Sequence, residues 1–434
     1  MLPRRVIRLG ALLAGGLLLS VRPVCAQSSQ GTRPYQGLFG SDTRGADALH
    51  LVDLSIGVNA AAERASFGDM GPEVEAPADD HQFEEYYLAL GQLSYARRGR
   101  PVHFSARGGV AYPYYSLFPN SNTLAYDAAS DVSVSSRTTT AGAAASYRYS
   151  PYYSLDFGGF QTDYSSAYSP NNEVGATASL KHAFGRRTTA NMSYSAGTTV
   201  FLDEDRETRH QGAAASIERR LSKTTVIRAG YAYERFSATE PETLGSSLSQ
   251  SHGVDVGLGY TRRLSSVRQF TVEGSVGLNK LEPDVDDEMN WRGSLRATYA
   301  MSRNWGASAG YLRTFESASG LFQPVWADYA NAQVVGYVGR RLTLSFGAFY
   351  TRGNDVNFPE SKFTDQGGQV RAQLGVSPNL AVYAQYMYYW YDFPPTFDLP
   401  EGMSPTLKRH RIQLGISTWF PLVRAGRAPG AGSQ

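Results

Sequence analysis

The stretch from Gln250 to Arg263 reads QSHGVDVGLGYTRR, and its centre alternates strictly between two kinds of side chain. Val254, Val256 and Leu258 are apolar, whereas the positions between them hold an aspartate and a glycine. A period of two is the spacing of a β-strand, in which successive side chains point to opposite faces of a sheet. This stretch therefore predicts a strand with one apolar face and one polar face.

The same alternation recurs along the chain and predicts about 18 strands. Strands are joined in pairs by short turns, many of them basic, such as Arg219-Arg220-Leu221-Ser222. Longer, more acidic loops separate one pair from the next. The predicted strands are 49–60, 82–97, 101–115, 122–135, 138–158, 171–184, 188–201, 208–221, 224–237, 250–264, 268–281, 288–301, 304–315, 328–340, 342–352, 364–376, 380–392 and 408–421.

The two faces of these strands decide between a soluble sandwich and a membrane barrel. A sandwich buries faces rich in Val, Ile and Leu between two sheets. Here alanine, glycine and tyrosine are common on the apolar face, and the other face carries arginine and glutamate in mid-strand. Lipid outside and water inside satisfy both faces, and closure removes unpaired edges. We predict an all-β fold: a closed antiparallel up-and-down transmembrane β-barrel of 16–18 strands, with short periplasmic turns and long extracellular loops.

The N-terminal residues predict export. Met1–Arg8 carries three arginines and no acidic residue, and Leu9–Val21 is largely apolar. Small residues at Val24 and Ala26 then fit a signal-peptidase site. An anchor helix, or lipidation of Cys25, the only cysteine, is the alternative. The predicted organisation is a cleaved signal peptide (1–26), a short periplasmic segment (27–48), the barrel (49–421) and a flexible tail (422–434), in the outer membrane of a Gram-negative cell.

The last predicted strand resembles the C-terminal insertion signal of bacterial outer-membrane barrel proteins. It reads QLGISTWF from Gln413 to Phe420, with a polar residue, a glycine two positions on and aromatics near the end. Thr418 departs from the usual aromatic, and residues 421–434 form an extension. The resemblance implies recognition by the barrel-assembly machinery. The repeat of basic turn, alternating strand and acidic loop is also similar to β-barrel porins associated with exopolysaccharide systems.

Charged residues on the polar face are the candidate lumen lining. The alternation assigns to it Arg107, Arg148, Lys181, Arg228, Arg292, Arg296, Arg371 and Arg411, together with Asp127, Asp131, Glu173, Glu218, Glu234, Asp255 and Glu273. Eight basic residues against seven acidic ones give no field of a single sign. We expect such a lining to discriminate weakly by charge, because sharp selectivity needs a ring of like charge at a constriction. The alternative is that these residues pair across strands and only keep the interior wet.

Aromatic and acidic groups outside this lining allow two further interpretations. Tyrosines near strand ends fit an interfacial girdle, but a lumen-facing row, with Tyr383 and Tyr389 as candidates, would instead fit sugar stacking. Divalent cations could bridge the acidic loops to lipopolysaccharide, but no segment has the glycine and spacing of a calcium loop, so solvated loops are the favoured explanation. The acidic loop residues are Glu73, Glu75, Asp79, Asp80, Asp203, Glu204, Asp205, Glu240, Glu242, Glu282, Asp284, Asp286, Asp287 and Glu288.

Several functional classes find no support in the sequence. The seven histidines are scattered without metal-ligand spacing, and no cofactor motif is present. The G-x-S-x-G match at Gly306–Gly310 lies inside an alternating strand, whereas a nucleophile elbow needs a strand-to-helix turn. A net charge of +2 offers no basic excess for nucleic acid. We therefore predict neither an enzyme nor a nucleic-acid-binding protein, and no cofactor or metal.

The sequence favours a passive or weakly selective outer-membrane channel for small solutes. Its expected partners are outer-membrane lipid and lipopolysaccharide, the assembly machinery, and the solutes or polysaccharide that pass. The alternatives are a polysaccharide export or docking barrel, and a structural or adhesive barrel without an open pore.

Overall fold

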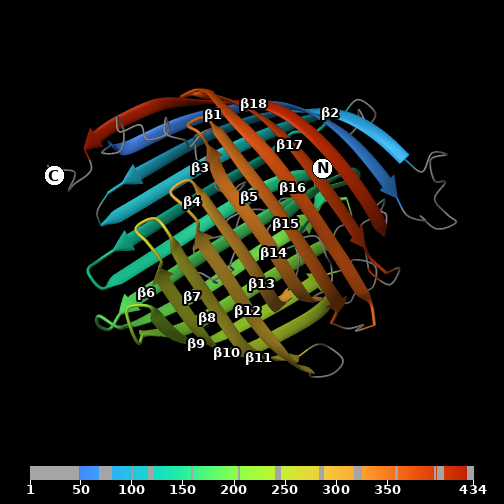
Figure 1. The fold of residues 1–434 in the computed structure, drawn as a ribbon. Helices are drawn as coiled ribbons and strands as arrows, with labels where there is room; N and C mark the ends of the chain where they lie inside the picture. Colours follow the sequence, from blue (N-terminus) through green and yellow to red (C-terminus); the bar gives the residue numbers. More distant parts are fainter. Residues whose placement is uncertain are drawn as a thin grey trace, which may run out of the picture.

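A computed structural model shows one closed sheet of 18 antiparallel strands (Figure 1). It describes residues 48–67, 81–99, 101–115, 122–157, 160–203, 206–239, 246–282, 288–316, 325–356, 360–394, 397 and 405–427. Each strand pairs with its neighbour in the sequence, and β1 also pairs with β18, so the ring is closed. Because every pairing is antiparallel, and all but the closing pair of β1 with β18 join consecutive strands, the predicted up-and-down barrel and its strand number are confirmed.

The strands are long enough to cross a bilayer at a tilt, which takes about 9–11 residues. In chain order they are β1 Ala48–Phe67, β2 His81–Arg98, β3 Val102–Tyr115, β4 Ala125–Ser135, β5 Thr139–Phe157, β6 Phe160–Ala183, β7 Thr188–Phe201, β8 Arg206–Arg220, β9 Thr225–Thr239, β10 Ser246–Arg263, β11 Gln269–Glu282, β12 Glu288–Ala300, β13 Trp305–Glu316, β14 Val325–Val338, β15 Leu342–Asp355, β16 Lys362–Ser377, β17 Leu380–Asp392 and β18 Thr406–Arg427. No helix among the described residues is long and apolar enough to cross a membrane.

Three strands run well beyond the boundaries that alternation predicts. β1 continues past residue 60 to Phe67, and β6 begins at Phe160 rather than at residue 171. β18 continues past Pro421 to Arg427, so residues 422–427, which the sequence assigned to a tail, pair with β1. Backbone pairing continues in each case where the alternation of apolar and polar residues fades. The predicted signal peptide, the segment before Ala48, most of the acidic loops and residues 428–434 lie outside the described residues.

Short turns occupy the end of the barrel that also holds the start of β1 and the end of β18 (Figure 1). Three of them use a serine in the same way. The hydroxyls of Ser222, Ser265 and Ser302 each accept hydrogen bonds from the backbone N–H groups two and three residues further on. Such serine turns tighten the backbone locally. Arg-Leu precedes the serine in two of these turns and Ala-Met in the third, so the serine is the turn signal that the three share.

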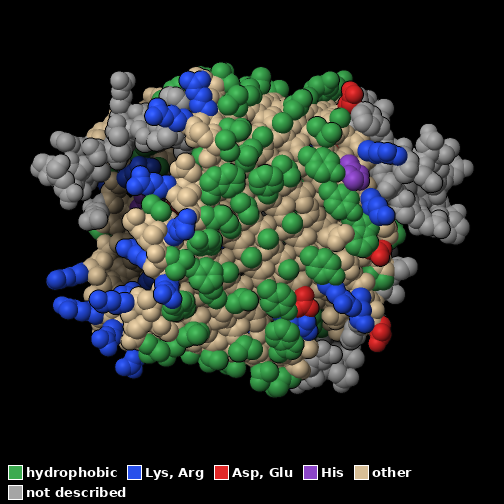
Figure 2. Space-filling view, in the orientation of Figure 1, with side chains coloured by type: hydrophobic (Ala, Val, Ile, Leu, Met, Phe, Trp, Pro, Cys, Tyr) green, Lys and Arg blue, Asp and Glu red, His purple; other side chains and the backbone are tan. Residues whose placement is uncertain are grey.

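The outer surface of the barrel is an apolar belt. Val256, Leu295 and Ile412, on well-separated strands, expose 62%, 52% and 58% of their surface. Figure 2 shows such apolar side chains spread over the barrel wall, with Lys and Arg gathered beyond them at the turn end. Exposed apolar side chains on a closed barrel face lipid rather than water. This arrangement is that of a transmembrane barrel.

The seam between β1 and β18 is held by buried ion pairs as well as by its backbone ladder. Towards the long-loop end, the carboxylate of Glu63 is shared by Arg409 and by Arg411, whose Nε lies 2.9 Å from Oε2. Towards the turn end, Asp53 pairs with Arg424. Only 3% of the Glu63 side chain is exposed. Because a buried carboxylate needs its partners, these pairs join the two ends of the chain in one register.

Candidate functional site in the barrel interior

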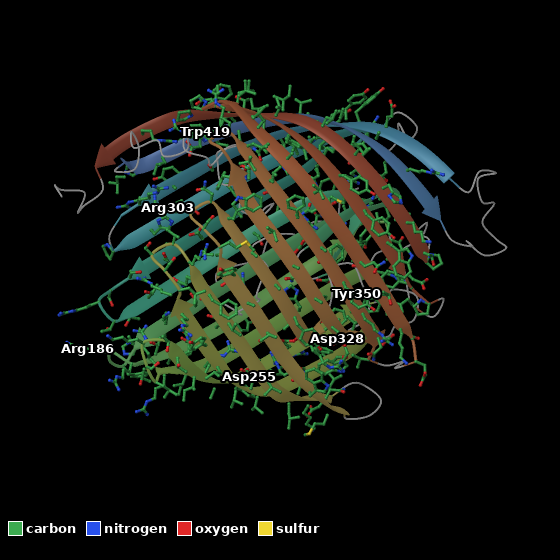
Figure 3. All side chains as sticks on the ribbon, in the orientation of Figure 1. Arg186, Asp255, Arg303, Asp328, Tyr350 and Trp419 are labelled. Carbon is green, nitrogen blue, oxygen red and sulfur yellow. The ribbon has the colours of Figure 1, made fainter. Side chains whose placement is uncertain are left out.

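The inward face is defined by the exposed residues on either side of it. On β10, Val254 and Val256 are exposed to the outside, so Asp255 between them points inward (labelled in Figure 3). The strand register carries this assignment around the ring, because residues directly opposite each other in neighbouring strands share a face. The same register places every predicted lumen residue on the inward side. Their role as the lining of a conducting pore stays a prediction.

Two pairs of these residues form ion pairs between neighbouring strands. Nη2 of Arg228 on β9 lies 3.1 Å from Oδ1 of Asp255 on β10. Nε of Arg148 on β5 lies 3.5 Å from Oε2 of Glu173 on β6. All four side chains remain partly accessible, between 13% and 34%. Charges paired in this way keep the wall hydrophilic and cancel much of each other's field.

Two further pairs lie close together. Glu273 on β11 is directly opposite Arg296 on β12 in the strand register. Arg292, also on β12, extends over Gly253 of β10, where a larger residue would meet its guanidinium. From there its positive charge acts on Glu234 of β9. The glycine therefore lets one arginine reach across two strands.

Arg371 and Arg107 have no ion pair among the described residues. The guanidinium of Arg371 stacks over the ring of Tyr383, 4.0 Å from its centroid, and the Tyr383 hydroxyl accepts a hydrogen bond from Nε2 of Gln413 at 3.4 Å. This ring also covers Gly415 of β18, which leaves it the necessary room. Arg107 on β3 lies opposite Ser94 and Ala129. Arg107 has Asp127 and Asp131 two positions to either side of Ala129 on the neighbouring strand, whereas Arg371 lies opposite the uncharged Ser345 and Gln385.

A cluster of apolar and aromatic side chains fills part of the interior at the long-loop end. We call it the lumenal aromatic cluster. Its buried members come from β7, β14, β16, β17, β18 and the segment after β17: Phe201, Val325, Ala327, Tyr329, Phe363, Tyr389, Tyr391, Phe393, Phe397 and Leu407. Phe363 stacks on Phe393 at 5.2 Å and meets Phe397 edge-on at 5.3 Å. These are the offset and edge-to-face arrangements that aromatic rings favour.

The cluster joins two opposite sides of the barrel wall. β7, which carries Phe201, lies half-way round the ring of 18 strands from β16, which carries Phe363. Both residues belong to the same packed cluster and are almost completely buried. The connection after β17 supplies Phe393 and Phe397 to it. The interior is therefore narrowed at this level by side chains, among them Phe393 and Phe397.

This cluster corrects part of the predicted aromatic girdle. Tyr112 and Tyr114 are exposed on the outer face, at 44% and 50%, in agreement with a girdle. Tyr389 and Tyr391, however, point inward and are buried. The sequence could not separate them, because aromatic residues occupy consecutive positions from 388 to 391 and alternation then has no polar face to identify. The sequence offers Tyr389 as a candidate for a lumen-facing row, whereas no pattern in it indicates the cluster as a whole.

The G-x-S-x-G match has no nucleophile-elbow geometry. Ser308 lies within β13, paired in register with Thr298 on one side and Gln333 on the other. A nucleophile elbow instead presents its serine on a strained turn between a strand and a helix.

Comparisons with known proteins give likenesses in fold alone. The sequence matches no protein-family model and no curated protein. Among solved structures, Acinetobacter baumannii OccAB4 has 10% sequence identity and a TM-score of 0.44, covering 88% of this chain and 100% of that one. Pseudomonas aeruginosa OprD has 10% identity and a TM-score of 0.43, covering 87% and 97%. Pseudomonas aeruginosa OccK2 (OpdF) has 10% identity and a TM-score of 0.45, covering 86% and 98%. These values are too low to assign a function, and they give no support to a link with exopolysaccharide systems.

Proposed function

We propose that this protein is an outer-membrane channel for small solutes, weakly selective by charge and narrowed near its outer end by the lumenal aromatic cluster. The observation that carries the proposal is the division of the closed 18-stranded wall into an apolar outer face and an inner face of paired charges. Barrels of about 16–18 strands are wide enough to leave an aqueous path.

Weak charge selectivity follows from the pairing of the inward charges. Arg228 with Asp255 and Arg148 with Glu173 place opposite charges side by side on the wall. A passing ion then meets little net field, whereas rings of one sign would exclude ions of that sign. The guanidinium of Arg371, which has no ion pair among the described residues, adds a modest preference for anions.

The proposal is tested by single-channel conductance of the refolded chain from Gln27 to Gln434 in a planar bilayer. We expect ohmic steps that are small for an 18-stranded barrel, with weak preference between potassium and chloride. A correctly folded barrel that never conducts, and that stays silent after the cluster is truncated, would show a structural or adhesive barrel instead.

A second candidate, a conduit for saccharides, is favoured by one observation. Tyr383, Tyr389 and Tyr391 all point inward from β17. Tyrosine faces stack on sugar rings. Because Tyr389 and Tyr391 are buried in the lumenal aromatic cluster, the half-buried Tyr383 is the ring of this row that could contact an oligosaccharide. Concentration-dependent blocking of the current by neutral oligosaccharides, lost in Tyr383→Ala, would favour this candidate. Equal conductance with and without sugars would exclude it.

A further inference from the structure

Four basic side chains lie on the outer face of the barrel, at its long-loop end. They are Arg64 on β1, Arg352 on β15, Lys362 on β16 and Lys408 on β18, and all four are exposed. We call them the outer basic rim. Each belongs to the outward series of its strand: Arg352 follows exposed Tyr350, and Lys408 precedes exposed Ile412 by two outward positions. Because these four residues lie on the same side of their strands as the exposed apolar residues, they point towards the membrane rather than into the interior.

No ion pair or hydrogen bond is found for these four side chains within the part of the chain that the structure describes. Outward cations elsewhere at this end are mostly neutralised. Arg209 lies 2.7 Å from Glu207, Lys280 lies 2.7 Å from Glu282, and Nη1 of Arg313 lies 2.6 Å from Asp328. Arg235 on β9 is also exposed and outward, and it is one further cation for which no pair is found among the described residues. Among the described residues, the outward cations without a partner are therefore concentrated on the arc from β15 through β18 to β1, which also carries exposed Asp392 and, opposite Arg352, Asp328.

Outward aromatic rings lie beside the rim and next to it on the side away from the long loops. Lys408 is directly opposite Trp390 in the strand register, and Arg64 is opposite His410. Nδ1 of His410 lies 2.9 Å from the hydroxyl of Tyr386, whose ring is 42% exposed. Outward aromatic side chains of a barrel lie at the height of the lipid headgroups. In Figure 2, Lys and Arg side chains lie along the long-loop edge of the apolar wall, beside a histidine and with several Asp or Glu side chains among them.

We propose that the outer basic rim binds the phosphate groups of outer-leaflet lipid, which in an outer membrane is lipopolysaccharide. Lysine and arginine bind phosphate oxygens through charge-assisted hydrogen bonds, and anionic lipid attracts basic residues at the membrane surface. The apolar belt directly below holds the acyl chains, so a phosphate attached to a lipid reaches the rim, whereas a free phosphate gains nothing from that belt. The site is independent of conduction through the interior.

The test compares lipid binding by two charge-matched variants of the refolded chain in detergent micelles. The rim variant carries Arg64→Gln, Arg352→Gln, Lys362→Gln and Lys408→Gln. The control carries Arg186→Gln, Lys223→Gln, Arg303→Gln and Arg340→Gln, which remove four exposed cations from the turn end (Arg186 and Arg303 are labelled in Figure 3). The probes are bisphosphorylated lipid A, its dephosphorylated form and inorganic phosphate, with bound lipid counted by native mass spectrometry.

We expect the rim variant to bind bisphosphorylated lipid A more than about tenfold less tightly, because each lost cation near an anionic lipid surface weakens binding about fivefold. Binding of the dephosphorylated form should be unchanged, and the control should bind as the original chain does. Equal binding by both variants, or equal affinity of the original chain for both lipid forms, would overturn the proposal. Displacement of lipid A by equimolar inorganic phosphate would identify a free-anion site instead.

Two measurements keep the result interpretable. The single variants Arg352→Gln and Lys408→Gln should each reduce lipid A affinity by about fivefold. They provide the test if the variant with four substitutions fails to fold. Single-channel conductance of the rim variant should equal that of the original chain, which separates this site from the proposed channel.

Discussion

The inner faces of two arcs of the barrel wall differ sharply, although their outer faces are alike. On β10 the inward positions 253, 257 and 259 are glycines, and Asp255 among them pairs with Arg228. On β14 to β18 the inward positions at the long-loop end hold the lumenal aromatic cluster. Both arcs expose apolar side chains to the outside. Contact with lipid therefore requires apolar outward residues on both arcs. The inward residues are free to differ, with glycines and paired charges on one arc and packed aromatic rings on the other.

The largest effect is expected from removing the aromatic arc. Phe363→Ala, Phe393→Ala and Phe397→Ala together should raise single-channel conductance severalfold, since these rings narrow the interior at one level. The matched control replaces three exposed rings of the outer face by alanine: Tyr112, Tyr126 and Tyr350. Conductance that rises as much in the control as in the triple variant would show that the cluster is not the constriction.

The seam offers the largest expected effect on stability. Glu63→Gln leaves Arg409 and Arg411 without their shared carboxylate and should lower the free energy of unfolding by about 3 kcal/mol or more. Glu173→Gln, in a partly exposed pair, should cost less than about 1 kcal/mol. Urea titration in lipid vesicles, followed by tryptophan fluorescence, measures both. Equal decreases in the free energy of unfolding would show that the ion pairs of the seam stabilise the barrel no more than a partly exposed pair does.

Gly415, on the arc that carries the aromatic cluster, offers a smaller test because the Tyr383 ring packs directly over it. The Tyr383 ring lies where a Cβ at residue 415 would stand, so Gly415→Ala should displace it from Arg371. We expect a loss of about 1–3 kcal/mol in unfolding free energy, as for other overpacked sites, together with a changed conductance. Gly185→Ala, in a turn with open space around it, is the control. A neutral Gly415→Ala would mean that the ring moves freely.

The smallest effect is expected on the arc of paired charges. Asp255→Asn leaves Arg228 uncompensated and should shift ion preference slightly towards chloride, while Arg228→Gln should shift it towards potassium. Reversal potentials across a salt gradient measure both shifts. Changes of the same sign in the two variants would contradict a wall of mutually cancelling charges.

Strand number and topology could be predicted because the alternation of apolar and polar residues is a local pattern, which can be recognised within each strand without knowing its neighbours. The residues of the seam and of the cluster could not, for physical reasons. Glu63 lies beyond three consecutive alanines, where alternation disappears, although the strand continues by backbone pairing alone. Its partners Arg409 and Arg411 lie at the other end of the chain, and only closure of the ring brings them together. Aromatic side chains suit both a lipid interface and a packed interior, so their direction depends on the register of neighbouring strands.

The seam also has a consequence for the order of assembly. Seventeen hairpin contacts join strands that are adjacent in the sequence, and serine turns help to form several of them locally. The contact between Asp53 and Arg424 instead closes a chain segment of 371 residues. Loop-closure entropy makes such a contact late in folding. A slip of one residue at that last step would turn Asp53 and Glu63 towards lipid. The buried carboxylates thus favour the correct register at closure, because only correctly aligned edge strands pair Asp53 and Glu63 with their arginines.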